Sequence, residues 1–109
     1  GDFMLGANEM RTNMVIPTPI LELIKFRVNE SHKYRAVMGA EMYTLEKAQE
    51  AGLIDEVVKQ EDLMKAALEK AKDLETMGHP SYTITKELFI AEPMSKINEA
   101  MKEYKNNSI

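Results

Sequence analysis

Apolar residues recur with a helical period along much of the chain, and most clearly between Glu61 and Met77. In this stretch they follow one another at steps of three and four residues, while charged residues occupy the opposite face. Asp62 is a candidate N-cap, Gly78 a candidate left-handed C-cap, and Pro80 prevents the helix from continuing. The pattern therefore predicts an amphipathic helix that ends at Met77.

Capping residues predict shorter helices on both sides of this element. Ser31, Thr44 and Ser81 are candidate N-caps, and Pro93 fits the first position of a final helix. Gly39 and Gly52 follow two of these helices, where a helix commonly stops. The predicted spans are 19–28, 31–38, 44–52, 81–90 and a last helix from residue 93 that includes Tyr104.

Two segments do not fit a helical period. Phe3–Met10 contains Gly6 and is a candidate strand, and Leu53–Val58 is rich in β-branched residues and is predicted to be a short extended return. Residues 11–19 are predicted to form a loop. A lone strand would leave backbone donors and acceptors unpaired, which indicates a missing partner, either an upstream stretch of chain or another subunit. The predicted fold class is mainly α, with short helices and one or two short strands.

The composition is that of one ordinary soluble domain, with 109 residues, 44% of them apolar and 29% charged. Because cysteine is absent, disulfides, thiolate metal sites and cysteine nucleophiles are excluded, and we expect a reducing, cytoplasmic location. The apolar runs are too short to cross a bilayer. The chain begins with glycine instead of methionine, so we expect a processed chain or a piece of a longer one.

The charge pattern and the absence of common motifs narrow the function further. The net charge of −4 is spread evenly and neither half is strongly basic, so neither nucleic acid nor a membrane surface is an expected partner. No phosphate loop, HExxH or GxSxG motif occurs, and no metal or cofactor is predicted. His32 and His79 have no evident partners and are interpreted as turn residues.

Glu9 is the candidate catalytic residue. It follows an apolar segment and precedes an irregular loop, and a carboxylate in such a place suits general acid or base chemistry. The alternative interpretation is an exposed glutamate at the end of a strand. Nine methionines add a second open question, since they fit core packing but those in the first part could also line an adaptable apolar pocket.

Several motifs resemble the enoyl-CoA hydratase/isomerase (crotonase) superfamily in order and spacing. They are the segment GDFMLGANEM, Pro17 in the loop after it, and Ala48 followed by Ala51-Gly52-Leu53-Ile54-Asp55. The resemblance covers nearly the whole chain but corresponds only to the C-terminal part of the family's fold. It implies that residues 1–58 form a strand, loop and helices at the end of the crotonase core, and that residues 59–109 form a helical oligomerisation region.

The resemblance also implies roles for individual residues. Glu9 matches the family's catalytic glutamate, which moves a proton near the α, β and γ carbons of the substrate. Met14, Ile16 and Pro17 fall in the loop beside the acyl chain. The substrate would be a coenzyme A thioester, as in fatty acid metabolism, with no other cofactor. Since a single glutamate transfers the proton, an isomerase fits better than a hydratase, although other crotonase chemistry stays open.

Two features set limits on this expectation. Asn13 stands where many members of the family have glycine, and the sequence Ile16-Pro17-Thr18-Pro19 replaces a glycine-rich loop. In addition, the resemblance places the oxyanion hole and the second catalytic glutamate of hydratases before Gly1, so we expect the isolated chain to be catalytically impaired. The alternative function is a small helical oligomerisation or interaction module without catalysis, and in either case a homo-oligomer, a trimer or a larger assembly, is expected.

Overall fold

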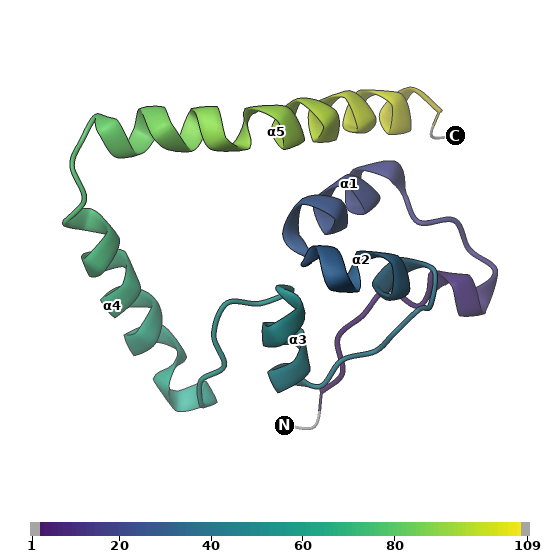
Figure 1. The fold of residues 1–109 in the computed structure, drawn as a ribbon, viewed down its shortest axis with the longest axis horizontal. Helices are drawn as coiled ribbons and strands as arrows, with labels where there is room; N and C mark the ends of the chain where they lie inside the picture. The colour runs from purple at the N-terminus through teal and green to yellow at the C-terminus, as the bar shows by residue number, and fades with distance from the viewer. Residues whose placement is uncertain (1–2, 108–109) are drawn as a thin grey trace. The chain divides into compact units, whose positions relative to one another are not determined.

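The computed structural model describes residues 3–107, and Figure 1 shows them as a ribbon. Gly1 and Asp2, with which the motif GDFMLGANEM begins, lie outside the described residues. The chain divides into two compact units, a first unit of Gly1–Val57 with Pro93–Ile109 and a second unit of Val58–Glu92. The helices, in chain order, are η1 (Glu9–Thr12), α1 (Thr18–Arg27), α2 (Glu30–Val37), α3 (Leu45–Ala51), η2 (Gln60–Asp62), α4 (Leu63–Glu75) and α5 (Ser81–Asn107). The predicted mainly α fold class is confirmed.

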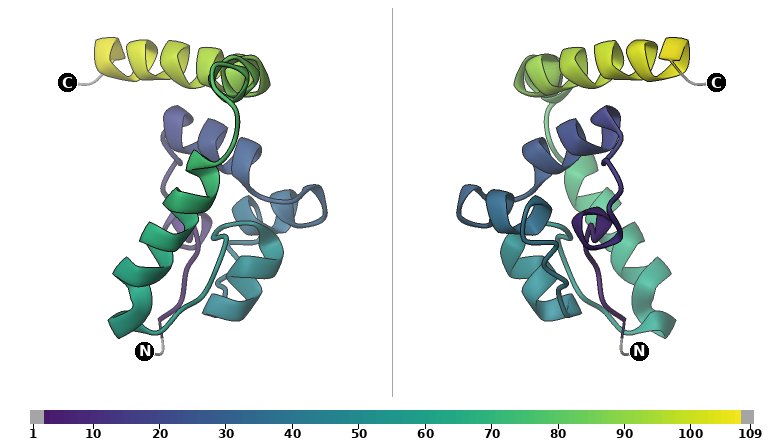
Figure 2. Two further views of the ribbon diagram at one scale, coloured as in Figure 1. Left: turned by 90° about the vertical axis from the view of Figure 1, so that its left-hand side faces the viewer. Right: turned by 90° about the vertical axis from the view of Figure 1, so that its right-hand side faces the viewer.

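The candidate strand Phe3–Met10 is not a strand. Leu5 pairs with Tyr43 in an isolated antiparallel bridge, and the chain turns into η1 at Glu9. The two paired segments, residues 3–8 and the stretch leading into α3, run side by side in Figure 2. The bridge pairs the backbone N–H and carbonyl of Leu5 within the chain, without a β-sheet. The partner expected outside the chain stays a prediction. Leu53–Val58 likewise contains no strand.

The α3 helix begins and ends as its sequence predicts. The hydroxyl of Thr44 accepts a hydrogen bond from the backbone N–H of Lys47 at 3.3 Å, which satisfies one of the unpaired donors at the start of the helix. Gly52 ends the helix in the left-handed conformation, with φ of 88°. A Cβ at this position would lie 2.9 Å from the side-chain oxygen of Asn29, so both backbone angle and space favour glycine.

The α2 helix begins earlier than predicted. Its N-cap is Asn29 and not Ser31, which lies inside the helix. The side-chain amide of Asn29 donates to the carbonyl oxygen of Glu50 at 2.5 Å, and its backbone N–H donates to the carbonyl of Ala51 at 2.8 Å. Asn29 therefore joins the start of α2 to the end of α3, a tertiary contact that the local sequence does not reveal.

The core of the first unit is small and rich in alanine. Ala48 and Ala51 are completely buried, and the segment that follows α3 turns Leu53 and Ile54 back against them. Asp55 then forms an ion pair with Arg27 at the end of α1. The motif Ala-Gly-Leu-Ile-Asp thus closes the unit with a glycine stop, two packed apolar residues and an ion pair. The buried residues of this core are Val28, Ala36, Tyr43, Ala48 and Ala51.

The helix predicted to end at Met77 is shorter than its periodic pattern. The α4 helix ends at Glu75, and Thr76 closes it by donating its hydroxyl hydrogen bond to the carbonyl of Asp73 at 2.6 Å. Gly78 does not adopt the left-handed conformation, so the predicted glycine cap is wrong. Asp62 makes no side-chain capping bond; it is the last residue of η2, and its backbone is in the αR region and not in the extended conformation typical of an N-cap.

The two helices predicted on either side of Pro93 are one helix, α5, which passes through the boundary between the units. Proline removes one N–H donor from a helix interior and clashes with the carbonyl four residues earlier. The long stretches of helix-forming residues on both sides carry the helix past that single defect. Within the described residues, no helix is long and apolar enough to cross a membrane.

Candidate functional site

The four residues singled out in the sequence lie around one cavity in the first unit. Glu9, Met14, Ile16 and Pro17 all line a cavity of about 630 Å³, a size typical of small-molecule sites. The remaining lining residues are Asn8, Thr12, Val15, Thr18 and Tyr104. The cavity thus combines a carboxylate, an apolar wall and several neutral hydrogen-bonding side chains.

The backbone around Glu9 is held by a tight turn. Its carbonyl oxygen accepts hydrogen bonds from the backbone N–H of Met14 at 2.9 Å and from the hydroxyl of Thr12 at 3.1 Å. Asn13 reverses the chain in the left-handed conformation, with φ of 56° and ψ of 39°. Asparagine tolerates this conformation better than most residues. This explains why Asn13 can occupy a position where glycine is common in the superfamily that the sequence resembles.

The side chain of Glu9 is half-buried and has no partner in the part of the chain that the structure describes. No hydrogen bond or ion pair to its carboxylate is formed within residues 3–106. Glu9 also borders a second, apolar cavity of about 330 Å³, where Leu5, Ile20 and Ile24 are among the lining residues. A carboxylate with no protein partner at the edge of apolar surface is available to a ligand.

The apolar wall of the larger cavity combines exposed side chains with an anchored backbone. Ile16 is only 5% exposed, whereas the neighbouring Met14 is 59% exposed and Val15 is 88% exposed. Pro17 is half-buried and forms the N-cap of α1, and Pro19 is buried in the first turn of that helix. The loop therefore presents exposed apolar side chains beside Glu9 from a backbone that is fixed at Ile16 and Pro17.

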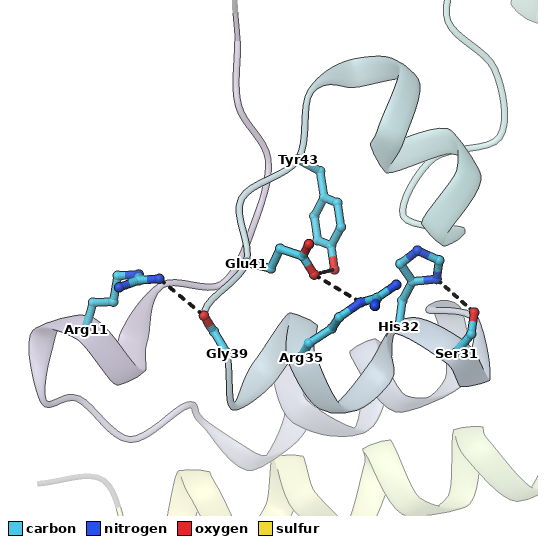
Figure 3. Close-up of polar contacts among 7 residues, drawn as sticks. All are labelled: Arg11, Ser31, His32, Arg35, Gly39, Glu41 and Tyr43. Carbon is cyan, nitrogen blue, oxygen red and sulfur yellow. Dashed lines mark hydrogen bonds and ion pairs between the residues drawn. The ribbon is translucent and has the colours of Figure 1, made fainter.

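A polar cluster holds the segment that pairs with Leu5 (Figure 3). The hydroxyl of Tyr43 donates to Oε2 of Glu41 at 2.9 Å, and Nε of Arg35 lies 3.3 Å from the same oxygen. Burial raises the pKa of Tyr43, and the hydrogen bond to Glu41 raises it further. Arg11, in the turn that contains Glu9, donates to the carbonyl of Gly39 at 3.5 Å. This hydrogen bond ties the turn that contains Glu9 to the segment between α2 and the cluster.

Neither histidine lies at the cavity. His32 is within α2, contrary to its interpretation as a turn residue, and its Nδ1 lies 3.0 Å from the hydroxyl of Ser31 (Figure 3). His79 precedes α5, with its ring 6.2 Å from that of Tyr82. Among the described residues, no group of three histidine or carboxylate side chains is arranged to hold a metal ion.

Tyr104 is the cavity residue that lies farthest from the others in the sequence. The sequence did not identify it, nor its fellow lining residues Asn8, Thr12, Val15 and Thr18. Tyr104 belongs to the last turns of α5, while the other lining residues lie between Asn8 and Thr18. The helical period does place Tyr104 on the same face as Ile97, which indicates that it packs inward. The helical period does not indicate which residues this face of the helix packs against. Only the structure shows that Tyr104 lines the same cavity as Glu9.

Comparisons with known proteins identify structural relatives. No protein-family model and no curated protein matches the chain. Among solved structures, an enoyl-CoA hydratase/isomerase family protein from Pseudomonas syringae matches with a TM-score of 0.87 and 29% identity, covering 100% of this chain and 47% of that protein. An enoyl-CoA hydratase from Mycobacterium marinum matches with a TM-score of 0.85 and 27% identity, and the match covers 96% of this chain and 47% of the hydratase.

A third relative, from Mycobacterium tuberculosis, is described as an enoyl-CoA isomerase in one structure and as a probable enoyl-CoA hydratase in another. The first of these structures matches with a TM-score of 0.85 and 27% identity, covering 96% of this chain and 46% of that protein. The chain therefore spans about half the length of the relatives that it matches. The predicted resemblance to the enoyl-CoA hydratase/isomerase superfamily, limited to one part of its fold, is confirmed. The roles of Glu9, Met14, Ile16 and Pro17 stay predictions.

Proposed function

We propose that this chain, which has the fold of part of the enoyl-CoA hydratase/isomerase superfamily, contributes the proton-transfer carboxylate and the acyl-chain wall of an enzyme acting on acyl-CoA thioesters. The observation that carries the proposal is the cavity shared by Glu9, Met14, Ile16 and Pro17. Its apolar wall suits an acyl chain, and the unpartnered carboxylate suits a base beside it. A place in fatty acid metabolism and a cytoplasmic location belong to the same proposal.

The reaction that best fits one carboxylate is migration of a double bond. Glu9 takes a proton from C2 of a 3-enoyl thioester, and the electrons delocalise into a dienolate. The protonated Glu9 then returns the proton to C4, which leaves the 2-enoyl thioester and the original carboxylate. Hydration would require a second acid or base to activate water, and Glu9 is the only carboxylate among the residues that line the cavity.

The dienolate needs donors to its oxygen, and in the superfamily two backbone N–H groups provide them. The resemblance assigns these donors to the part of the fold that the present residues do not match. Loss of a single oxyanion-hole donor typically lowers the rate by about 10²–10³-fold. Residues 1–109 alone are therefore expected to bind an acyl thioester at the Glu9 cavity but to turn it over slowly.

The test separates binding from proton transfer. A 3-enoyl N-acetylcysteamine thioester is titrated into the 109-residue chain while backbone amide NMR signals are followed, and deuterium incorporation at C2 is measured in D₂O. We expect signals from Asn8–Thr18 to shift, and Glu9→Gln to abolish any exchange above buffer. The matched control, Glu56→Gln, changes an exposed carboxylate outside both cavities. Shifts confined to other residues, or exchange that survives in Glu9→Gln, would contradict the proposal.

The second candidate function is assembly, and the exposed apolar face of α4 favours it. Leu63, Met64 and Leu68 are 61%, 70% and 54% exposed, and they lie on one side of a helix whose other side carries charged residues. Exposed apolar surface of this kind commonly marks a protein interface. A homo-oligomer, a trimer or a larger assembly, is the expected state in sedimentation equilibrium.

A further inference from the structure

Tyr104 joins the cavity from the opposite end of the sequence. The other eight lining residues belong to one continuous segment, Asn8–Thr18, which supplies the carboxylate and the apolar wall. Tyr104 stands 86 positions beyond Thr18 and is carried on α5. A ligand in the cavity would therefore contact the side chain of Tyr104, whose position depends on α5, as well as side chains whose positions depend on the Asn8–Thr18 segment.

The helix that carries Tyr104 is placed by one face. Within α5, Pro93 and Ile97 are half-buried and Ala100 is 4% exposed, and these residues follow one another at steps of four and three. Tyr104 comes four positions after Ala100 and so continues the same face. The packed face of α5 therefore ends with the aromatic ring of Tyr104, which lines the cavity.

The side chain of Tyr104 is not committed to another contact in the described part of the chain. It is 53% exposed, and its hydroxyl forms no hydrogen bond within residues 3–106. Large aromatic rings on rigid helices are effective cavity walls, because few bonds rotate and much area is presented. Tyr104 is therefore free to contact a ligand while its backbone stays in the helix.

We propose that Tyr104 is a specificity-determining residue, whose ring limits the length of the acyl chain that the Glu9 cavity accepts. This inference rests on the proposed function, since it assumes that an acyl group occupies the cavity. The apolar side chains of Met14, Val15 and Ile16 gain contact with each added methylene, and the ring of Tyr104 ends that gain where the chain reaches it.

The experiment is a titration of the 109-residue chain with saturated acyl N-acetylcysteamine thioesters from butanoyl to decanoyl, followed by the NMR signals of Asn8–Thr18. For the unaltered chain, affinity should rise by about fourfold for each methylene that is buried and then stop rising at one chain length. Tyr104→Ala should move this stop to longer chains. Tyr104→Phe should leave the stop in place, because it keeps the ring and removes only the hydroxyl.

Tyr34→Ala is the matched control, because Tyr34 is 78% exposed on α2 and lines neither of the cavities at Glu9. It should leave the length dependence unchanged. Binding at the cavity with the same stop in Tyr104→Ala would overturn the inference about Tyr104 alone. If none of the thioesters shifts the signals of Asn8–Thr18 in the unaltered chain, both this inference and the proposed function are wrong.

Discussion

Leu5 and Tyr43 exchange two backbone hydrogen bonds, with the N–H of Leu5 donating to the carbonyl of Tyr43 at 2.9 Å and the reverse bond at 2.7 Å. This pair fixes the chain four residues before Glu9 to the segment that leads into α3. The side chain of Tyr43 is held in turn through Glu41 and Arg35. The position of Glu9 therefore depends on a support that lies outside the cavity itself.

Gly6→Ala is expected to weaken this support. A Cβ at Gly6 would lie 2.6 Å from the carbonyl oxygen of Glu41, and this backbone atom can move only by disturbing the adjacent Leu5–Tyr43 pair. We expect a loss of about 1–3 kcal/mol in the free energy of unfolding, measured by urea denaturation. The control is Gly78→Ala, where the nearest atom is the hydroxyl oxygen of Ser81 at 3.3 Å. Equal effects of the two substitutions would contradict the prediction.

The raised pKa of Tyr43 predicts a dependence of stability on alkaline pH. An unfolded tyrosine loses its proton near the ordinary tyrosine pKa of 10.0. In the folded chain the pKa of Tyr43 is raised, first by burial and second by the hydrogen bond to Glu41 and its negative charge, so the proton stays bound to higher pH. The contribution of Tyr43 is therefore complete below pH 10 and is lost as the pH rises through the folded pKa. The free energy of unfolding should fall more steeply above pH 10 in the unaltered chain than in Tyr43→Phe. Parallel curves for the two proteins would rule this out.

Thr44→Ala should destabilise the start of α3. The substitution removes the hydroxyl that accepts the N–H of Lys47, and loss of an N-cap of this kind costs about 1 kcal/mol. Thermal unfolding followed by circular dichroism measures the change. Ser31→Ala is the informative comparison, because Ser31 was the predicted cap of α2 but lies inside that helix. Its effect should stay below about 0.5 kcal/mol, and a larger loss than that of Thr44→Ala would disagree with the observed caps.

Leu68→Lys is expected to dissociate the proposed homo-oligomer. The substitution places a charge within the apolar face of α4, and burying that charge at an interface would be costly. Sedimentation equilibrium should show a lower mass, with the helical circular dichroism signal preserved. Glu69→Lys introduces the same residue on the charged face and should leave the mass unchanged. A monomeric unaltered chain would contradict the assembly proposal directly.

The sequence predicted elements whose ends are set by local chemistry. Thr44 and Gly52 bound α3 as expected, because a capping hydroxyl and a left-handed glycine act within a few residues. Ser31 and Pro93 misled the prediction for the opposite reason. Asn29 starts α2 through a contact with α3, and α5 continues past its proline because the helix on both sides is long.

The same distinction applies to the candidate site. Glu9, Met14, Ile16 and Pro17 lie within nine consecutive positions, so a tight loop was enough to bring them together around one cavity. Tyr104 could not be placed there from its helical period, since that placement depends on how the end of α5 packs in the first unit. Local motifs thus predicted one side of the cavity, and long-range packing decided the other.

The burial of Ala100 has a consequence for how easily the last turns of α5 detach from the rest of the first unit. Within residues 81–106 of α5, Ala100 is the only buried position and the neighbouring Pro93 and Ile97 are half-buried, whereas α3 buries both Ala48 and Ala51 completely. A single methyl group contributes only about 0.8 kcal/mol when it is removed from water. The last turns of α5 should therefore separate from the rest of the first unit and exchange their amide hydrogens long before α3 does. Hydrogen-exchange mass spectrometry would detect this order, and an acyl thioester that contacts Tyr104 should slow the exchange of those turns.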